Sequence, residues 1–505
     1  MRNEPLATNP SPGPAAWGSS LLHTLTAAAA PGADYQPRNV NAALATVRRA
    51  FRDGTVWHSE LQQISAEVIR LNPPERRALV NLLAREWHDG QSLLDAWMGE
   101  VTMRGVGGYA GLQEGPRKTL LAHLVVGQDP VNLERIFHAA RNRHTGERQD
   151  TTFQMEFMHQ VSQRGTVAQR LGLLERLSDD AVRGNAGAGQ ALAQIVARLP
   201  DRAAVAQALD RLDRRATDAM VANSVTWRNE LTTSTLGGSS VTTRVDTRLI
   251  ESLARAVADT GNPREKAAFV AAAGSLLGRL RSADMQASAR DRAIGTVASA
   301  MSTVIGSDVN GVIENTLLQS DREGASSGRL ALKSYATALL DSKQGAHLGA
   351  ITLSLQRGND LQQDPMQWLS ARQARTGEAP AYVRAAVMGD WLGLVGSAIL
   401  SRISARDQHA AFAALMFSGS IDLMKETAGA AFPALKLPIG VGAAVLKPVI
   451  NLSLLHWRNS LARSDREFAR NLYEAALPYH PNGVEARGDW VTTMNAQFFS
   501  SLQRQ

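Results

Sequence analysis

Two pairs of glutamate and histidine residues are the side chains in this sequence best suited to metal chemistry. Glu134 and His138 are four residues apart, and Glu156 and His159 are three residues apart. Either spacing places both side chains on one face of a helix. A carboxylate-bridged di-metal centre needs a Glu-x-x-His motif on each of two helices and two more carboxylates, and only one such motif occurs. We therefore predict no metal, and keep these four residues as weak candidates against a role as ordinary polar side chains.

Glycine-rich segments provide no cofactor site by the same reasoning. The spacing Gly105-x-Gly107-x-x-Ala110 resembles a dinucleotide fingerprint, which requires a preceding strand. Here the preceding residues 93–101 have the pattern of a helix. No phosphate-binding loop, zinc-protease motif or nucleophile elbow occurs. His88-Asp89-Gly90 is interpreted as a helix end. We predict no cofactor, and the sequence favours a protein that is not an enzyme.

The composition indicates a folded, globular protein that has no disulfides. Of 505 residues, 44% are hydrophobic and 20% charged, which is typical of a globular chain. There is no cysteine, so disulfides and cysteine-based metal sites are excluded. The net charge of +7 is spread thinly, without a run of five basic residues. A nucleic-acid partner is therefore not expected.

Helices must supply the framework, and one stretch shows how they begin and end. Asn262 suits the N-cap of a helix that continues to Leu280, Pro263 suits the first helical position, and Glu265 can reach back to the cap. Apolar residues then recur at helical spacing. Such a helix must bury its apolar stripe against neighbouring helices.

An earlier stretch resembles this one. Gly165 corresponds to Gly261 at an offset of 96 residues, and apolar helices follow both. A later segment beginning at Asp201 corresponds to one beginning at Asp308, at an offset of 107. We predict an all-α fold with a multihelical, repeat-like body resembling an α-solenoid. The alternative is that helices rich in alanine, leucine and arginine resemble one another through composition alone.

Changes in composition suggest the boundaries between parts of the chain. A hydroxyl-rich segment around Gly237-Gly238 is either a linker or a short β-hairpin near 231–245. The predicted parts are a disordered N-terminal tail at 1–38, helical bodies at 39–228 and 247–355, the linker or hairpin at 229–246, a linker at 356–380, and an apolar C-terminal helical domain at 381–505.

The apolar C-terminal part raises the question of membrane contact. Ala385–Leu400 contains one charge, Asp390, and Thr427–Trp457 contains only Lys436 and Lys447. Those lysines and three prolines exclude a constitutive transmembrane helix, which needs about 20 mostly apolar residues. Either the segment is a buried core, or it enters bilayers conditionally. The candidate membrane-contacting residues are Trp391, Leu392, Leu394, Phe412, Leu415, Phe417, Leu435, Lys436, Val441, Val445, Leu446 and Lys447.

Two functions are consistent with these features. The first is a secreted bacterial effector or toxin whose helical C-terminal region becomes membrane-active, with virulence as its context. The second is a non-enzymatic helical-repeat scaffold for protein–protein interaction. We expect a protein partner in either case, and an anionic membrane in the first. Because Glu4 offsets Arg2 and His23 interrupts the apolar segment 19–30, we predict no cleavable signal peptide, leaving specialised secretion or a cytoplasmic location.

Overall fold

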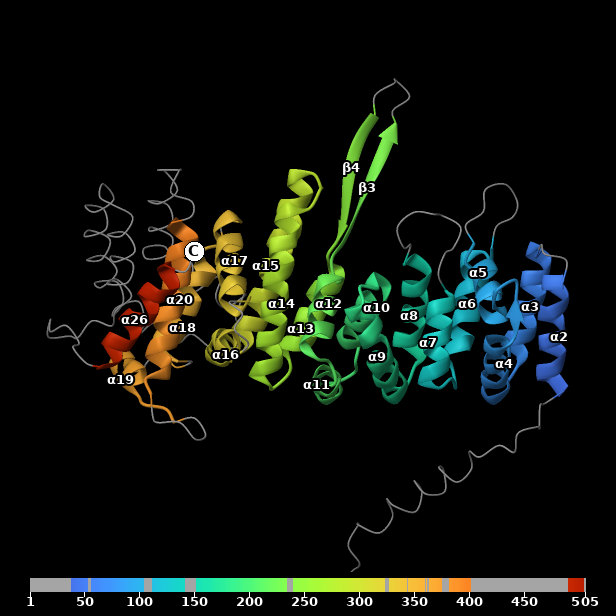
Figure 1. Cartoon of the computed structure of the whole chain (residues 1–505), viewed down its shortest axis with the longest axis horizontal. Coiled ribbons are helices and arrows are strands. Elements are labelled where there is room, and N and C mark those ends of the chain that lie inside the picture. The colour runs from blue at the N-terminus through green and yellow to red at the C-terminus, as the bar shows by residue number, and fades with distance from the viewer. Residues whose placement is uncertain are drawn as a thin grey trace, which may run out of the picture.

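The computed structural model describes residues 38–52, 56–103, 111–140, 151–233, 239–322, 327–342, 344–358, 360, 363–374, 381–400 and 489–503. The described residues are 78% helical and hold 20 helices and two small antiparallel strand pairs. The predicted all-α, multihelical fold is therefore confirmed. The helices stand side by side in an elongated row that follows the order of the chain (Figure 1). Of the predicted tail at 1–38, residues 1–37 lie outside the described residues and Arg38 begins the first described helix. The other domain boundaries stay predictions.

The first part of the row runs to α12. Its elements are α2 (Arg38–Arg52), α3 (His58–Arg70), α4 (Pro73–Arg85), β1 (Trp87–His88), β2 (Gln91–Ser92), α5 (Leu93–Val101), α6 (Glu114–Val125), α7 (Pro130–Ala139), α8 (Thr152–Arg164), α9 (Val167–Val182), α10 (Ala186–Ala197), α11 (Arg202–Asp210) and α12 (Arg214–Ala222).

The second part begins with a β-hairpin. Its elements are β3 (Thr226–Thr233), β4 (Ser239–Asp246), α13 (Arg248–Ala258), α14 (Pro263–Ser282), α15 (Ala287–Ser307), α16 (Val309–Arg322), α17 (Ser327–Asp341), α18 (Ala346–Arg357), α19 (Pro365–Ser370), α20 (Val383–Leu400) and α26 (Asp489–Gln503). One cluster of buried hydrophobic side chains runs through both parts, from Val40 to Phe498.

Helix starts follow the capping pattern of the sequence. Asn72 Oδ1 accepts a hydrogen bond from the Glu75 backbone N–H at 2.9 Å, and Glu75 Oε2 accepts one from the Asn72 N–H at 2.9 Å. Asn262 caps α14 differently, because its Oδ1 accepts from the Arg264 N–H at 3.0 Å. Its amide also donates to Glu265 Oε1 at 2.9 Å. Glu265 thus reaches the cap through the asparagine side chain rather than through its backbone.

The order of helices repeats as the sequence predicts. A helix, a turn and a longer helix form α8–α9 and again α13–α14, and two further helices follow each pair. Asp201 caps α11 through the Ala204 N–H at 2.8 Å. Asp308 caps α16 in the same way through the Gly311 N–H at 3.0 Å. The two copies therefore share the cap of their fourth helix as well as their order.

Of the two predicted alternatives, a linker or a short hairpin, the structure contains the hairpin, which is longer than expected. β3 and β4 pair antiparallel from Thr226 with Asp246 to Thr233 with Ser239. At its base the Asn229 amide donates to the Asp284 carbonyl at 3.2 Å. From the α12–α13 connection the hairpin projects away from the row of helices (Figure 1). A two-stranded ribbon is marginal alone, and this hydrogen bond attaches it to the α14–α15 turn.

The C-terminal end of the row is closed by α20 and α26. Trp391, Leu392 and Leu394 of α20 are at most 4% exposed, packed among α17, α18 and α26. No helix in the described part of the chain is both long and apolar enough to cross a bilayer. The remaining candidate membrane residues lie outside the described residues: Phe412, Leu415, Phe417, Leu435, Lys436, Val441, Val445, Leu446 and Lys447.

The one charge in the apolar stretch of α20 has partners on two other helices. Asp390 Oδ2 is 3.1 Å from Arg329 Nη2 of α17, and Asp390 Oδ1 accepts a hydrogen bond from the Ser501 hydroxyl of α26. All three residues are at most 9% exposed. This contact fixes α26 against the body.

Candidate functional site

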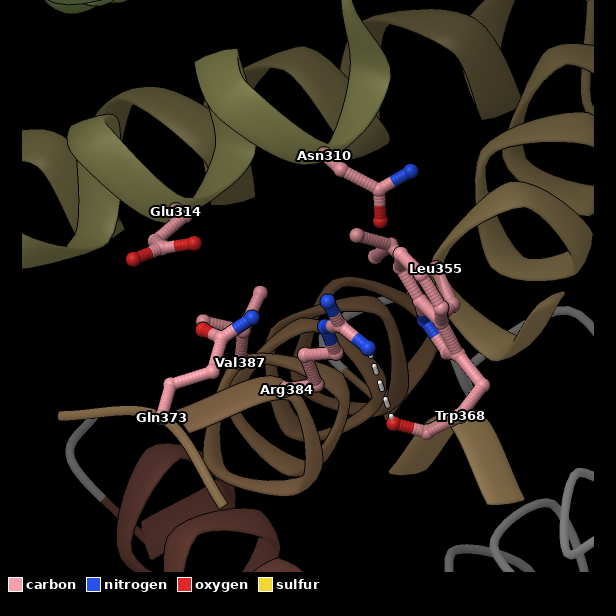
Figure 2. Close-up of a pocket in the computed structure, with 7 residues that line it drawn as sticks. All are labelled: Asn310, Glu314, Leu355, Trp368, Gln373, Arg384 and Val387. Atoms are coloured by element: carbon pink, nitrogen blue, oxygen red, sulfur yellow. Dashed lines mark hydrogen bonds between the residues drawn. The ribbon is translucent and has the colours of Figure 1, made fainter. Parts of the chain in front are cut away.

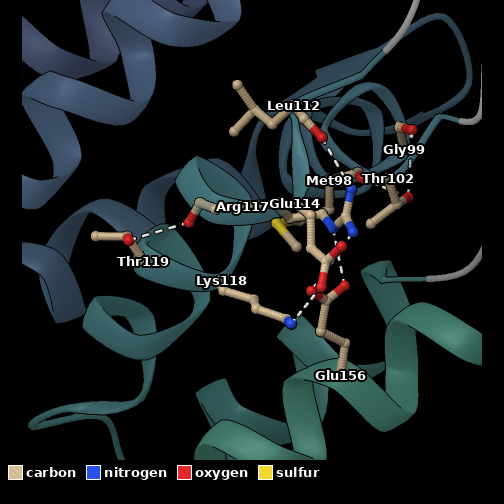
Figure 3. A network of polar contacts seen from close by, with 10 residues as sticks. Met98, Gly99, Thr102, Leu112, Glu114, Arg117, Lys118, Thr119 and Glu156 are labelled. Carbon is tan, nitrogen blue, oxygen red and sulfur yellow. Dashed lines mark hydrogen bonds and ion pairs between the residues drawn. The ribbon is translucent and has the colours of Figure 1, made fainter.

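Glu156, one of the weak metal candidates, belongs to an ion pair between α6 and α8. Arg117 Nε lies 2.8 Å from Glu156 Oε2, and Arg117 Nη1 donates to the Leu112 carbonyl at 2.8 Å (Figure 3). The guanidinium also stacks on the Phe153 ring, with its carbon 4.8 Å from the ring centre. Both charged side chains are at most 15% exposed. The carboxylate is therefore occupied by an arginine rather than by a histidine.

His159 points to different neighbours from Glu156. Arg198 Nη1 donates to His159 Nδ1 at 2.7 Å, and the Gln163 amide nitrogen lies 2.9 Å from His159 Nε2. Burial, followed by the nearby Arg198 charge, lowers the pKa of His159. The Glu-x-x-His spacing thus produces two separate polar contacts in place of a shared site.

Glu134 and His138 are brought together, and a third side chain joins them. Both lie on α7, whose start is fixed by Asp129 accepting from the Asn132 N–H at 2.8 Å. Asp180 of α9 places its Oδ2 2.9 Å from His138 Nε2. One possible ligand atom from each of the three residues lies within 4.8 Å of the other two. The sequence spacing identified two members, but the third comes from another helix and carried no sequence signal.

A groove of about 690 Å³ lies between the α10–α11 connection and α13, at the junction of the two repeat units. Leu199 and Val205 supply apolar surface from one wall and Ala256 from the other. Ser252 also lines it, and its hydroxyl donates to the Arg248 carbonyl at 3.0 Å. The lining residues are Ala197, Leu199, Pro200, Asp201, Arg202, Val205, Ser252, Arg255, Ala256 and Asp259.

The charges at the groove are balanced. Asp201 and Arg202 belong to one wall, and Arg255 and Asp259 to the other, and all four are exposed. A Cβ atom at Gly261 would lie 2.0 Å from Arg202 Nη2. The glycine therefore leaves room for this guanidinium to cross the start of α14. Two carboxylates beside two guanidiniums disfavour a phosphate backbone as ligand.

A smaller cavity of about 150 Å³ lies near the C-terminal end of the row (Figure 2). Arg384 stacks on Trp368, with the guanidinium carbon 3.4 Å from the ring centre. With the Gln373 amide oxygen facing the guanidinium, it accepts from Nε at 2.8 Å and Nη2 at 2.9 Å. Burial lowers the pKa of Arg384, while the Glu314 charge acts in the opposite direction. These contacts join α19 and α20, and we interpret the cavity as a packing defect beside them.

One local signal was missed from the sequence. Asp89-Gly90 is the two-residue turn of a short β-hairpin whose first strand ends at His88, and the segment is not a helix end. Asp89 and Gly90 both have positive φ, at 46° and 77°, and connect β1 to β2. An Asp-Gly pair is the preferred sequence for such a turn.

Comparison with known proteins adds little. The chain matches no protein-family model and no curated protein. It is similar to a crystal structure described as an engineered protein, at 14% identity and a TM-score of 0.23, over 87% of this chain and 99% of that chain. At that TM-score the similarity supports no statement about fold or function.

Proposed function

We propose that this protein is a non-enzymatic helical-repeat scaffold that binds a segment of a protein partner in the groove between α11 and α13. The observation that supports this most is the groove itself, an apolar surface flanked by balanced charges where two repeat units meet. Stacked helical repeats use such surfaces to bind other chains.

The chemistry of the groove favours a polypeptide. Its volume of about 690 Å³ falls in the range of pockets that enclose a small ligand or a few side chains. Leu199 and Ala256 can contact an apolar anchor residue, while Arg255 and Asp201 on opposite walls can pair with charges of either sign. Such an arrangement of apolar centre and polar rim is usual at protein interfaces.

The test begins with a random-peptide display library selected against the full chain. Ala256→Trp fills the groove. It is expected to weaken the binding of the selected peptides at least about tenfold, as loss of a buried anchor does. Ala203→Trp is the matched control, because Ala203 is exposed on α11 outside the groove, and it should bind as the parent does. Equal binding by both variants would count against the groove.

A second readout uses the absence of cysteine from the chain. A single Ser252→Cys variant can be labelled with a fluorescent dye at one position in the groove. Its emission should shift when a selected peptide binds. An unchanged emission at saturating peptide would place binding elsewhere on the molecule.

The alternative proposal is a secreted effector with a conditionally membrane-active C-terminal region. Trp391, Leu392 and Leu394 could reach a bilayer only after α20 leaves the body, because they are buried. Dye release from anionic liposomes tests this, with the full chain compared to residues 1–380 at neutral and acid pH. Leakage that requires residues 381–505 would favour the effector, and its absence would favour the scaffold.

A further inference from the structure

Glu134, His138 and Asp180 form the one cluster of three such side chains that the described residues bring within metal-binding distance of one another. Two helices supply the ligands, α7 with two of them one turn apart and α9 with the third. All three side chains are between one fifth and one third exposed. They are therefore shielded from bulk water, yet an ion could still reach them.

The ligand types select the class of metal. An imidazole nitrogen with two carboxylate oxygens suits Zn²⁺ and its first-row neighbours better than Mg²⁺ or Ca²⁺, which prefer oxygen ligands alone. Three protein ligands leave one position of a tetrahedral ion for water. We propose that Glu134, His138 and Asp180 bind Zn²⁺ and thereby link α7 to α9.

The geometry requires only side-chain movement. Zinc bonds of about 2.0–2.2 Å place tetrahedral ligand atoms about 3.4 Å apart. Asp180 Oδ2 and His138 Nε2 are now 2.9 Å apart, and the widest separation in the cluster is within 4.8 Å. The ion would replace the contact between Asp180 and the imidazole, and the Nε2 proton would leave for solvent or move to Nδ1. The helices can stay in place.

Two arginines compete with the metal for the carboxylates. Arg176 Nε forms an ion pair with Glu134, and Arg183 Nη1 lies 3.5 Å from Asp180 Oδ1. Both arginine side chains are at least 40% exposed, so either can turn into solvent. This competition provides a way to distinguish a metal site from a network of ion pairs by experiment. Removing Arg176 should therefore strengthen metal binding.

The experiment is a Zn²⁺ titration of the full chain, without a histidine tag, against a chromophoric chelator. The parent is expected to bind one Zn²⁺ ion. The variants His138→Gln and Asp180→Asn are each expected to weaken the affinity for Zn²⁺ at least about tenfold. His159→Gln is the matched control, since His159 lies on the next helix and outside the cluster. Arg176→Ala should bind Zn²⁺ more tightly than the parent.

A structural readout keeps the proposal testable where a ligand variant folds poorly. Zn²⁺ added to the parent should slow amide hydrogen exchange in α7 and α9 and leave α17 unchanged, because binding stabilises the elements it joins. Absence of stoichiometric binding, an equal loss of binding in His159→Gln, or weaker binding in Arg176→Ala would each overturn the proposal.

Discussion

Replacing Asp390 by alanine would leave the Arg329 guanidinium buried without its carboxylate partner. Arg329 Nη2 is 3.1 Å from Asp390 Oδ2, and both residues are less than 10% exposed. Removing one partner of a buried ion pair costs about 3–5 kcal/mol. The Ser501 hydroxyl loses its acceptor as well. We therefore expect the C-terminal end of the row to loosen well before the rest of the body.

Amide hydrogen exchange of α26 measures this cost locally, which matters because a chain of this length need not unfold in one step. A loss of about 3 kcal/mol corresponds to exchange more than about 100-fold faster. Ser501→Ala, which removes one hydrogen bond to a charged group, should cost about 1.5–3 kcal/mol. Exchange in α7 should not change in either variant.

The double variant Arg329→Met with Asp390→Leu provides the control. An apolar pair of similar volume removes both charges, and such replacements are often neutral or stabilising. Exchange of α26 should then return close to the parent rate. The reasoning would be refuted if Asp390→Ala accelerated exchange less than about tenfold, which corresponds to about 1.4 kcal/mol.

Further predictions concern packing and pH. Gly274→Ala should lower the melting temperature by overpacking worth about 1–3 kcal/mol, because its Cβ would lie 2.3 Å from an α17 backbone atom. Gly278→Ala, with nothing within 4 Å of its Cβ, should be neutral or stabilising by up to about 1 kcal/mol; equal effects of the two substitutions would contradict this. Burial lowers the pKa of His347 in the folded protein, so the unfolded chain takes up its proton first and stability should fall as pH drops below about 6.5. His347→Gln should reduce that loss when melting temperatures at about pH 7.5 and 5.5 are compared, and an unchanged pH dependence would show that His347 is not its source.

Features that depend only on residues close together in the chain could be predicted from the sequence. The cap at Asn262 depends on atoms two and three residues away, so residue types and spacing were enough to predict it. The Asp89-Gly90 turn was equally local, and its signal was present but was interpreted as a helix end. The all-α fold followed from the sum of such local preferences and apolar periodicity.

Contacts between distant residues could not be predicted. Asp390 stood out as a single charge in an apolar stretch, but its partners are 61 residues before and 111 residues after it. Glu156 and His159 share a helix, yet α6 supplies an arginine to one and the C-terminal end of α10 an arginine to the other. Asp180 likewise joins Glu134 only because α9 packs on α7. Each outcome depended on which neighbouring helix packed there.

The closure of the row by α26 also bears on how the protein is made. Repeats that contact only their neighbours can fold one after another as they leave the ribosome. Asp390 must wait for Ser501, which is 111 residues later, or about 6–22 seconds at ordinary rates of synthesis. Throughout that interval the apolar surface around Trp391 lacks the helix that covers it. Since exposed apolar surface is what chaperones bind, we expect them to engage a nascent chain in this state, and slower translation would lengthen its exposure.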